Sequence, residues 1–171
     1  MLAAKLPNVQ PTSQRMRVRG EPCSLAGMLL RFVDVTDPLY QHALELRYRV
    51  LREPLGRPRS EVTFPFEAAC IHLVAIDDNQ TRGCVMFHPE TERSGRLMQM
   101  AVDSAIQGRG LGRLLVQTLE AELVRRGWLQ VQLHARAPMV GFYERLGYTT
   151  YGEPYLEIGL PHQSMHKTLA P

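Results

Sequence analysis

Hydrophobic and polar positions along the chain predict strands in its first half and alternating strands and helices in its second half. Short runs rich in apolar residues predict four strands, at residues 29–35, 71–76, 83–87 and 96–102. Between 110 and 126, six residues lie at helical spacing on one face: Leu111, Leu114, Leu115, Thr118, Leu119 and Leu123. A strand at 128–133, a short helix at 138–146 and two last strands around Pro161 complete the pattern. The pattern predicts an α/β fold, with a mixed sheet flanked by helices.

The first helix is expected to begin at Asp37 and Pro38, because Asp is a favoured N-cap and Pro suits the first helical position. It should continue through Leu51 and stop before Pro54. The proline-containing stretch 54–66 is expected to be an irregular loop. Residues 1–27 mix Pro, Gly, Ser and Arg without periodicity, which predicts a flexible N-terminal leader before a single domain at 28–171.

Composition narrows the classes of protein to which the chain can belong. A net charge of only +3, from 20 basic and 17 acidic residues, argues against nucleic-acid binding. The cysteines Cys23, Cys70 and Cys84 form no CxxC pair, which argues against a disulfide framework and a metal site. No apolar stretch approaches the ~20 residues that cross a bilayer. We therefore expect a cytoplasmic protein that does not act at a membrane.

A glycine-rich turn at 107–112 lies between the strand ending at Val102 and the long helix. Glycines let the backbone approach a ligand closely, and the first amides of a helix have no partners within it. A phosphate or pyrophosphate can accept hydrogen bonds from those amides. The arrangement is typical of an anion site, although a tight turn without any ligand remains an alternative.

Two other glycine-loop motifs fit less well. A P-loop needs Lys and then Ser or Thr after its last glycine, whereas Arg113 and Leu114 follow here. A dinucleotide fingerprint needs GxGxxG, but the spacing here is GxGxG, and no acidic residue ends a strand ~20 residues further on. ATP and NAD are therefore weaker candidates as ligands.

The same loop resembles the Q/R-x-x-G-x-G/A signature of the GNAT superfamily of acyl-CoA N-acyltransferases, at Gln107, Gly110 and Gly112. Residues 100–103 (MAVD) resemble the fourth strand of that superfamily, and 142–148 (FYERLGY) resemble its FYE-x-x-GF segment. Within the superfamily, residues 47–53 and 157–165 resemble a helix and the C-terminal ending of the ElaA-like group. The resemblance covers about residues 29–169 and implies a single-domain GNAT-like mixed sheet.

The resemblance implies that acetyl-CoA is a co-substrate. Its pantetheine arm is expected to pair with the strand at Met100, Ala101 and Val102, as if it were another strand. The pyrophosphate is expected to lie against the following loop residues: Gln107, Gly108, Arg109, Gly110, Leu111, Gly112 and Arg113. Many members carry Asn shortly after the fifth strand, where this chain has Arg136.

Catalysis is expected to involve Tyr143, because a tyrosine hydroxyl can protonate the thiolate that leaves the thioester. The alternative is that Tyr143 only completes the apolar face of its helix. His162 is a second catalytic candidate, since it lies in the matched C-terminal block and attack requires a neutral amine. The other candidates for a base are His72, His88, His134 and Glu53.

The implied reaction is direct attack of a primary amine, on a small molecule or a protein, on the acetyl thioester. Arg47, Arg49 and Glu53 lie at helical spacing where members of the superfamily wall the acceptor pocket, so they are expected to bind the acceptor. Solvated salt bridges are the alternative for these three. A non-catalytic acyl-CoA-binding module that regulates or scaffolds a partner remains an alternative function. The sequence leaves the acceptor and the assembly, including a homodimer, undecided.

Overall fold

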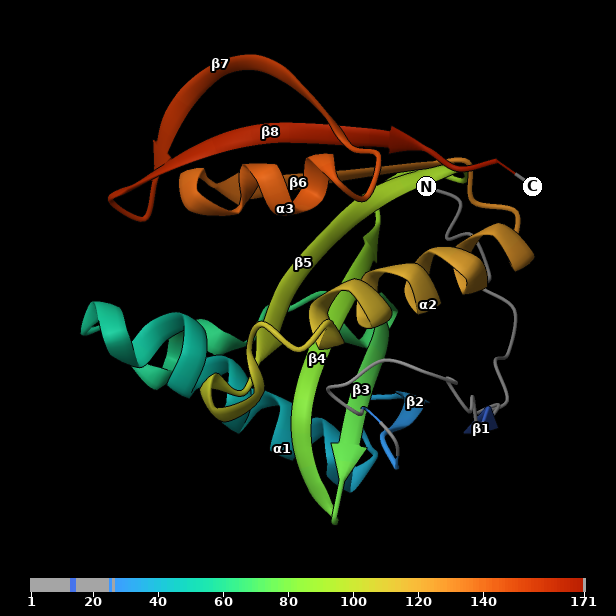
Figure 1. The fold of residues 1–171 in the computed structure, drawn as a ribbon, viewed down its shortest axis with the longest axis vertical. Coiled ribbons are helices and arrows are strands. Elements are labelled where there is room, and N and C mark those ends of the chain that lie inside the picture. Colours follow the sequence, from blue (N-terminus) through green and yellow to red (C-terminus); the bar gives the residue numbers. More distant parts are fainter. Residues whose placement is uncertain (1–12, 15–24, 26, 171) are drawn as a thin grey trace.

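Eight strands pair into one mixed sheet in the part of the chain that the computed structural model describes, residues 13–14, 25 and 27–170 (Figure 1). In chain order the strands are β1 (Ser13–Gln14), β2 (Leu29–Val33), β3 (Ile71–Asp77), β4 (Gln80–Pro89), β5 (Ser94–Val102), β6 (Gln130–Arg136), β7 (Thr149–Glu157) and β8 (Leu160–Thr168). Their order across the sheet is β1-β2-β3-β4-β5-β6-β8-β7. All neighbours run antiparallel except β5 and β6, which are parallel. The predicted mixed sheet is confirmed.

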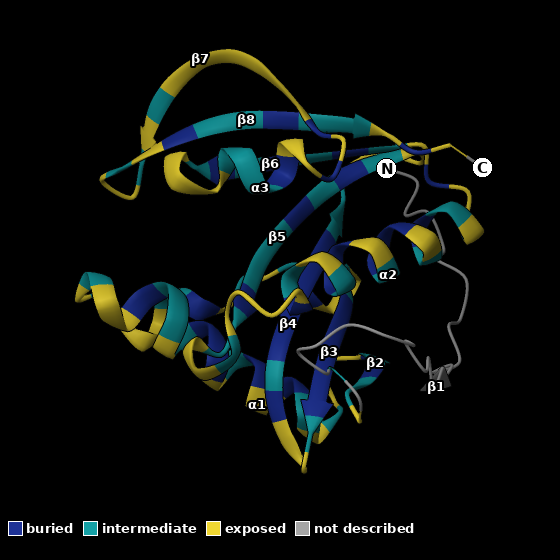
Figure 2. Cartoon of the chain, in the orientation of Figure 1, coloured by how far each residue is buried: buried dark blue, intermediate teal, exposed yellow. Residues whose placement is uncertain are grey.

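Helices cover both faces of this sheet: α1 (Pro38–Arg47), α2 (Leu111–Arg125) and the short α3 (Val140–Glu144). Alternating residues of β3 serve the two faces, because successive side chains of a strand point to opposite sides. Val74 and Ile76 pack in the cluster beneath α1, whereas Leu73 and Ala75 pack in the larger cluster beneath α2. Figure 2 shows the buried central strands between these helices.

The predicted start of α1 is confirmed, and its end contains an unpredicted feature. The Asp37 side chain accepts a hydrogen bond from the Leu39 backbone N–H at 2.9 Å, with Pro38 in the first turn. After Arg47 the chain continues as a π-helical turn, η1 (Tyr48–Arg52). Such wide turns inside helices often occur at functional sites. The stretch predicted to be irregular contains short 3₁₀ turns, η2 (Glu53–Leu55) and η3 (Arg59–Val62), and η4 (Glu67–Ala69) follows it.

Strands β5 and β6 separate along their length (Figure 1). Their pairing is limited to residues 94–96 of β5 with 130–132 of β6. A bulge then bends β5, because its register with β4 shifts between Cys84 and Met86, and Gln99 adopts a left-handed φ of 52°. A bulge bends a strand and redirects a side chain. The second half of β5 therefore follows β4 and leaves its edge toward β6 without a strand partner among the described residues.

The predicted flexible leader, residues 1–27, falls almost entirely outside the described residues. Of its described residues, Ser13 and Gln14 pair with Leu30 and Arg31 of β2. The described helices include none that is long and apolar enough to span a membrane.

Candidate functional site

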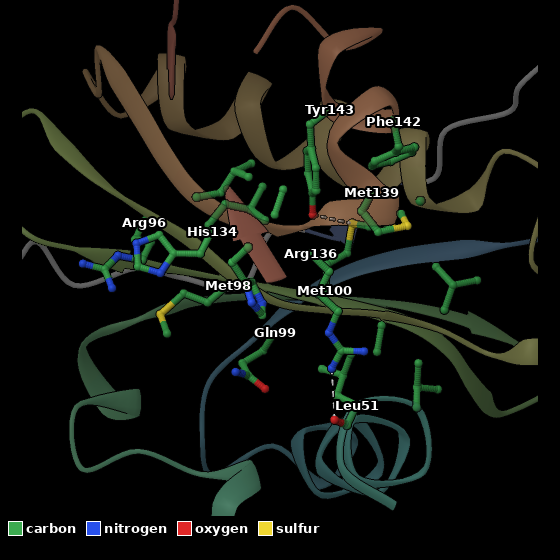
Figure 3. Close-up of a pocket in the computed structure, with 18 of the residues that line it drawn as sticks. Leu51, Arg96, Met98, Gln99, Met100, His134, Arg136, Met139, Phe142 and Tyr143 are labelled. Carbon is green, nitrogen blue, oxygen red and sulfur yellow. Dashed lines mark hydrogen bonds between the residues drawn. The ribbon is translucent and has the colours of Figure 1, made fainter. Parts of the chain in front are cut away.

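A cavity of about 1220 Å³ lies where β5 and β6 separate (Figure 3). Its walls come from six parts of the chain: the turn η1 and the loop after it, β5, the glycine-rich loop with the first turn of α2, the end of β6, α3, and the turn between β7 and β8. Segments from both halves of the chain therefore meet at one site, and the bend in β5 opens the space between them.

The glycine-rich loop has the geometry of an anion site. Gly108 and Gly110 adopt left-handed φ angles of 77° and 88°, and a Cβ on either would meet no atom within 4 Å. Gly110 is the N-cap of α2 and has no side chain to cap the helix. The Leu114 N–H donates to the Gly110 carbonyl at 3.1 Å, so the three preceding amides, at 111–113, have no partner within the helix. Residues 111–113 line the cavity, and free amides at a helix N-terminus are donors that suit an anion.

Side chains around the loop hold it to β5. The Gln107 side-chain amide donates to the Val102 carbonyl at 2.9 Å, and Asp103 caps the short turn η5 (Ser104–Ile106). The signature Gln107 therefore has a positioning contact in addition to its place in the cavity wall. Of the two predicted arginines, Arg113 lines the cavity, whereas Arg109 is exposed and does not line it.

The edge of β5 can accept an extended ligand. Met100, Ala101 and Val102, which the sequence predicts to pair with a pantetheine arm, all line the cavity. Because β5 pairs with β6 only as far as Arg96, the backbone groups beyond that residue have no strand partner on this side within the described part of the chain. An extended chain with amide groups, such as a pantetheine arm, can form hydrogen bonds along such an edge.

Tyr143 lies at the cavity on the side of α3. Its side chain is 7% exposed, and its hydroxyl lies 3.8 Å from the Met100 sulfur across the gap between α3 and β5 (Figure 3). Burial raises the pKa of the Tyr143 hydroxyl well above its ordinary value. The group therefore stays protonated at physiological pH and above, so its O–H is available as a hydrogen-bond donor.

Two histidines also line the cavity, on the face of the sheet opposite the core that contains Tyr143. They are His134 on β6 and His162 on β8. His134 Nδ1 lies 2.8 Å from a Glu157 carboxylate oxygen. His162 Nδ1 lies 2.9 Å from the Leu160 carbonyl oxygen, which can only accept, so Nδ1 must donate. In a neutral ring each contact places the proton on Nδ1 and leaves Nε2 as the acceptor. Both rings are therefore oriented as proton acceptors.

The remaining candidate bases do not line this cavity. His72 is buried beside Arg47, and burial lowers its pKa. His88 stacks on Phe66, with ring centroids 4.0 Å apart. Glu53 lines a separate hollow of about 400 Å³ together with Arg49, next to Gln107.

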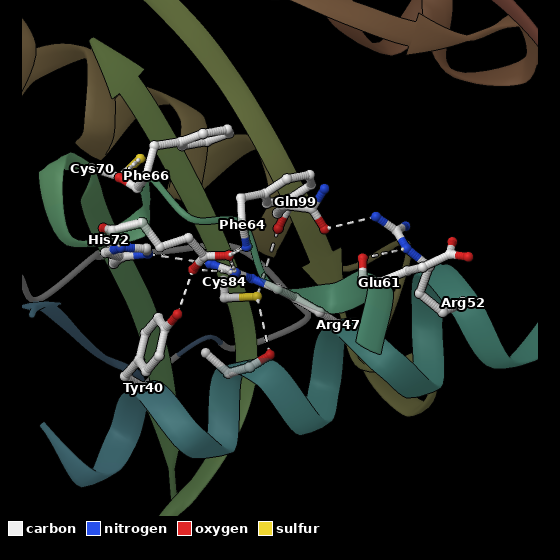
Figure 4. A network of polar contacts seen from close by, with 12 residues as sticks. Tyr40, Arg47, Arg52, Glu61, Phe64, Phe66, Cys70, His72, Cys84 and Gln99 are labelled. Atoms are coloured by element: carbon white, nitrogen blue, oxygen red, sulfur yellow. Dashed lines mark hydrogen bonds and ion pairs between the residues drawn. The ribbon is translucent and has the colours of Figure 1, made fainter. Parts of the chain in front are cut away.

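The predicted acceptor contacts require correction. Arg47 is 1% exposed and forms an ion pair with Glu67, 2.8 Å between Nη1 and Oε2 (Figure 4). It points into the interior beneath α1 and is not placed to contact an acceptor, because helical spacing alone does not tell which residue faces the sheet. Arg49 contacts Asp103, 3.8 Å between Nη2 and Oδ2, and forms no ion pair with Glu53. Arg49 and Glu53 lie at the smaller hollow and not in the main cavity.

Sequence reasoning missed the residues that do reach the main cavity from the turn η1 and from β6. Arg52 donates to the Glu61 carbonyl at 3.0 Å and to the Gln99 side chain at 3.3 Å. Arg136 donates to the Leu51 carbonyl at 3.2 Å. Alternation along β6 could have placed Arg136 on the same face as His134. Nothing in the sequence indicated the π-helical turn that directs Arg52.

Comparisons with known proteins agree with this architecture. Residues 64–169 match the family model described as an acetyltransferase (GNAT) domain. A Bacillus subtilis protein named as an acetyltransferase is 30% identical over 128 residues, which cover 73% of this chain and 86% of that protein. A crystal structure named as an N-acetyltransferase from Lactobacillus plantarum matches with a TM-score of 0.77 at 25% identity, over 84% of this chain and 99% of that one.

Two further solved structures share the fold. Escherichia coli ElaA matches with a TM-score of 0.71 at 17% identity, over 82% of this chain and 99% of that one. An aminoglycoside 6'-N-acetyltransferase complexed with coenzyme A matches with a TM-score of 0.70 at 20% identity, over 83% and 97%. At these identities the likeness concerns the fold alone.

Proposed function

Because this chain belongs to the GNAT acetyltransferase family, we propose that it is an N-acetyltransferase that transfers the acetyl group of acetyl-CoA to a primary amine. The observation that carries the proposal is one cavity that joins three features: the uncapped start of α2, the open edge of β5 and the Tyr143 hydroxyl. The start of α2 would bind the phosphates of the co-substrate, and the edge of β5 would bind its pantetheine arm. The Tyr143 hydroxyl would contact the sulfur at the end of that arm.

Acetyl-CoA would supply an activated acyl group and a thiol leaving group. The backbone amides of 111–113 would bind the pyrophosphate, with Arg113 close by. The arm would run along β5 from Val102 toward Met100, which leads its thioester to the Tyr143 hydroxyl. A backbone N–H of β5 at the Met100 end would stabilise the oxygen of the thioester carbonyl as it gains negative charge.

The reaction itself is a direct displacement. The nitrogen lone pair of the amine forms a bond to the thioester carbon, and the bond from that carbon to sulfur then breaks. Tyr143 donates its proton to the departing sulfur, and the nitrogen loses one proton to a base. A proton returned through solvent restores the Tyr143 hydroxyl, so that the products are an acetamide and coenzyme A with a free thiol. The raised pKa of the Tyr143 hydroxyl keeps it protonated at the pH at which amines lose their protons.

We infer that His162 accepts a proton from the amine. Its Nδ1 donates to the Leu160 carbonyl, which leaves Nε2 as the acceptor on a ring that lines the cavity. His134, held by Glu157, is a second acceptor on the same side. Replacing each histidine by Gln in turn shows which of the two is the base. Loss of the base lowers kcat most at pH values where the free amine is still protonated.

A covalent acetyl-enzyme lacks support in the described part of the chain. Neither Cys70 nor Cys84 lines the cavity. Burial raises the pKa of the Cys70 thiol to about 12, and it also raises that of Cys84. A thiol that stays protonated is a poor nucleophile, so direct attack is the mechanism we propose.

The first test is parallel calorimetric titration of the full chain with acetyl-CoA, CoA, ATP and NAD, followed by thiol release with a panel of amines. Selective micromolar binding of both CoA forms and acetylation of at least one amine would support the proposal. Binding without acetylation of any amine would favour the non-catalytic acyl-CoA-binding module. Absence of CoA binding by the folded chain would overturn the proposal.

A further inference from the structure

Two arginines reach the cavity from opposite walls and meet at one backbone atom. Arg52 belongs to η1 and Arg136 to the end of β6. Arg52 Nη1 and Arg136 Nη2 both donate to the Leu51 carbonyl oxygen, at 3.3 and 3.2 Å (Figure 3 shows the second contact). The two guanidinium groups therefore lie side by side in the cavity, although the residues are far apart in the sequence.

No carboxylate among the described residues pairs with either guanidinium. Two carboxylates line the same cavity, but both are engaged: Glu61 pairs with Arg57, and Glu157 pairs with His134. The remaining contacts of Arg52 and Arg136 go to carbonyl and amide oxygens, at Leu51, Glu61 and Gln99. Among the described residues, neither guanidinium therefore has a carboxylate within ion-pair distance, although the charge of Glu61 acts on Arg52 from farther away.

This arrangement is costly for the protein alone. Arg52 is 8% exposed and Arg136 is half-buried. Burial lowers the pKa of both guanidinium groups, and repulsion by Arg136 further lowers that of Arg52. If the two side chains only clamped the Leu51 carbonyl, an uncharged amide donor would serve as well. Paired, partly desolvated arginines are instead typical of sites that bind an oxyanion through their planar N–H groups.

The position of the pair assigns it to the acceptor and not to the co-substrate phosphates. Leu133 and Ala135 point from β6 into the core beneath α2 and α3, so Arg136 leaves the opposite face of the strand. His162 lies directly across from Arg136 in the pairing of β6 with β8. The anion site therefore shares a face with the groups proposed to deprotonate the amine.

We propose that the acceptor is an amine that also carries a carboxylate, and that Arg52 and Arg136 bind this carboxylate. The inference rests on the proposed function and names the class of its second substrate. Phe64 and Met98 line the same cavity and provide apolar surface for the carbon chain that joins the amine to the acid. A phosphate could use the same donors, so the test includes both anions.

The test measures thiol release from acetyl-CoA by the full chain with matched acceptors. Leucine, phenylalanine, β-alanine and 6-aminohexanoate are each compared with their own primary amides, and 2-aminoethyl phosphate represents the other anion. We expect kcat/KM for at least one acid to exceed that of its amide by about 10- to 100-fold, the scale of a charge-assisted hydrogen bond. Equal rates for acids and amides, or a preference for the phosphate, would overturn the inference.

Variants identify the residues responsible. Arg52→Gln and Arg136→Gln should each lower kcat/KM for the preferred acid by about 10-fold or more and bring the ratio of acid to amide close to one. Arg136→Lys should restore part of that ratio. Arg49→Gln is the matched control, because Arg49 lies outside the main cavity and should leave the ratio unchanged. An unchanged ratio in both Gln variants would also overturn the inference.

Binding of acetyl-CoA is measured for every variant and should stay within about twofold of the parent chain. If acetyl-CoA binds and amides are acetylated as fast as acids, the proposed transferase function is supported and only the inference about the acceptor fails. If acetyl-CoA does not bind, or no amine is acetylated, the proposed function itself fails and the inference fails with it.

Discussion

Arg47 and Glu67 form an ion pair beneath α1, 2.8 Å between Nη1 and Oε2, with only 1% and 4% of the two side chains exposed. The Tyr40 hydroxyl donates to the same carboxylate at 2.6 Å, and His72 contacts the Arg47 guanidinium at 3.2 Å (Figure 4). These contacts join α1 to η4 and β3. Because α1 continues into η1, the ion pair supports the cavity wall that carries Arg52.

Glu67→Gln should lower the free energy of unfolding by about 3–5 kcal/mol, because it leaves the buried Arg47 charge without a partner. Denaturant unfolding measures the loss. Glu45→Gln is the control, since Glu45 pairs with Arg59 on the surface, where such a pair contributes about 1 kcal/mol or less. Similar losses in the free energy of unfolding for the two variants would show that the buried ion pair stabilises the fold no more than the surface pair does.

Gly110→Ala should weaken acetyl-CoA binding by about 10-fold or more, because the added methyl group would project into the space assigned to the pyrophosphate. Gly127→Ala is the control that matches Gly110→Ala most closely. Gly127 follows the other end of α2, has a similar φ of 86°, and a Cβ added there would also meet no atom within 4 Å. Both variants should cost about 1 kcal/mol of stability for the left-handed backbone. Only the first should change the Kd measured by calorimetry.

Tyr143→Phe should lower kcat by about 100-fold while the Kd for acetyl-CoA stays within about twofold, because it removes the proton donor and little else. Steady-state thiol release and calorimetry provide the two measurements. Tyr151→Phe is the control, since Tyr151 is exposed and lies outside the cavity. A similar kcat for the Tyr143→Phe variant and the parent chain would assign Tyr143 to packing alone.

Stability should fall in alkaline solution. Burial raises the pKa of the Tyr143 hydroxyl above its ordinary value, so the folded chain keeps a proton that the unfolded chain loses above pH about 10. The free energy of unfolding is then unaffected by this group below that pH and declines above it by about 1.4 kcal/mol per pH unit. Denaturant unfolding between pH 9 and 11.5 should show a shallower decline for Tyr143→Phe. If the free energy of unfolding fell as steeply with pH in the Tyr143→Phe variant as in the parent chain, the raised pKa of Tyr143 would not be the cause of the decline.

Cys70→Ser should leave the rate of acetyl transfer within about twofold, because direct attack requires no thiol nucleophile. The pKa of the Cys70 thiol is raised to about 12, so at pH 8 only about one molecule in 10⁴ carries a thiolate there. Alkylation of Cys70 by iodoacetamide at pH 8 should accordingly be slow, as peptide mass mapping can show. A labelled acetyl group trapped on Cys70 would contradict the mechanism.

Local chemistry in the sequence determined the elements and the glycine-rich loop at the start of α2. Asp37 and Pro38 start α1 where expected, because capping depends on neighbouring residues only. Gly108 and Gly110 lie between β5 and α2 as expected, because a left-handed turn and a helix N-terminus are properties of a short segment. Tyr143 and His162 both line the cavity, while their chemical roles remain predictions.

Only the tertiary structure decided which charged residues reach the main cavity. Helical spacing selected Arg47, Arg49 and Glu53 and passed over Arg52, but packing on the sheet buried Arg47, and the π-helical turn directed Arg52 into the cavity. The contact of Arg136 with the Leu51 carbonyl joins residues 85 positions apart. Such a contact depends on the bend of β5 and on its separation from β6, which arise from the assembled sheet and leave no local signal in the sequence.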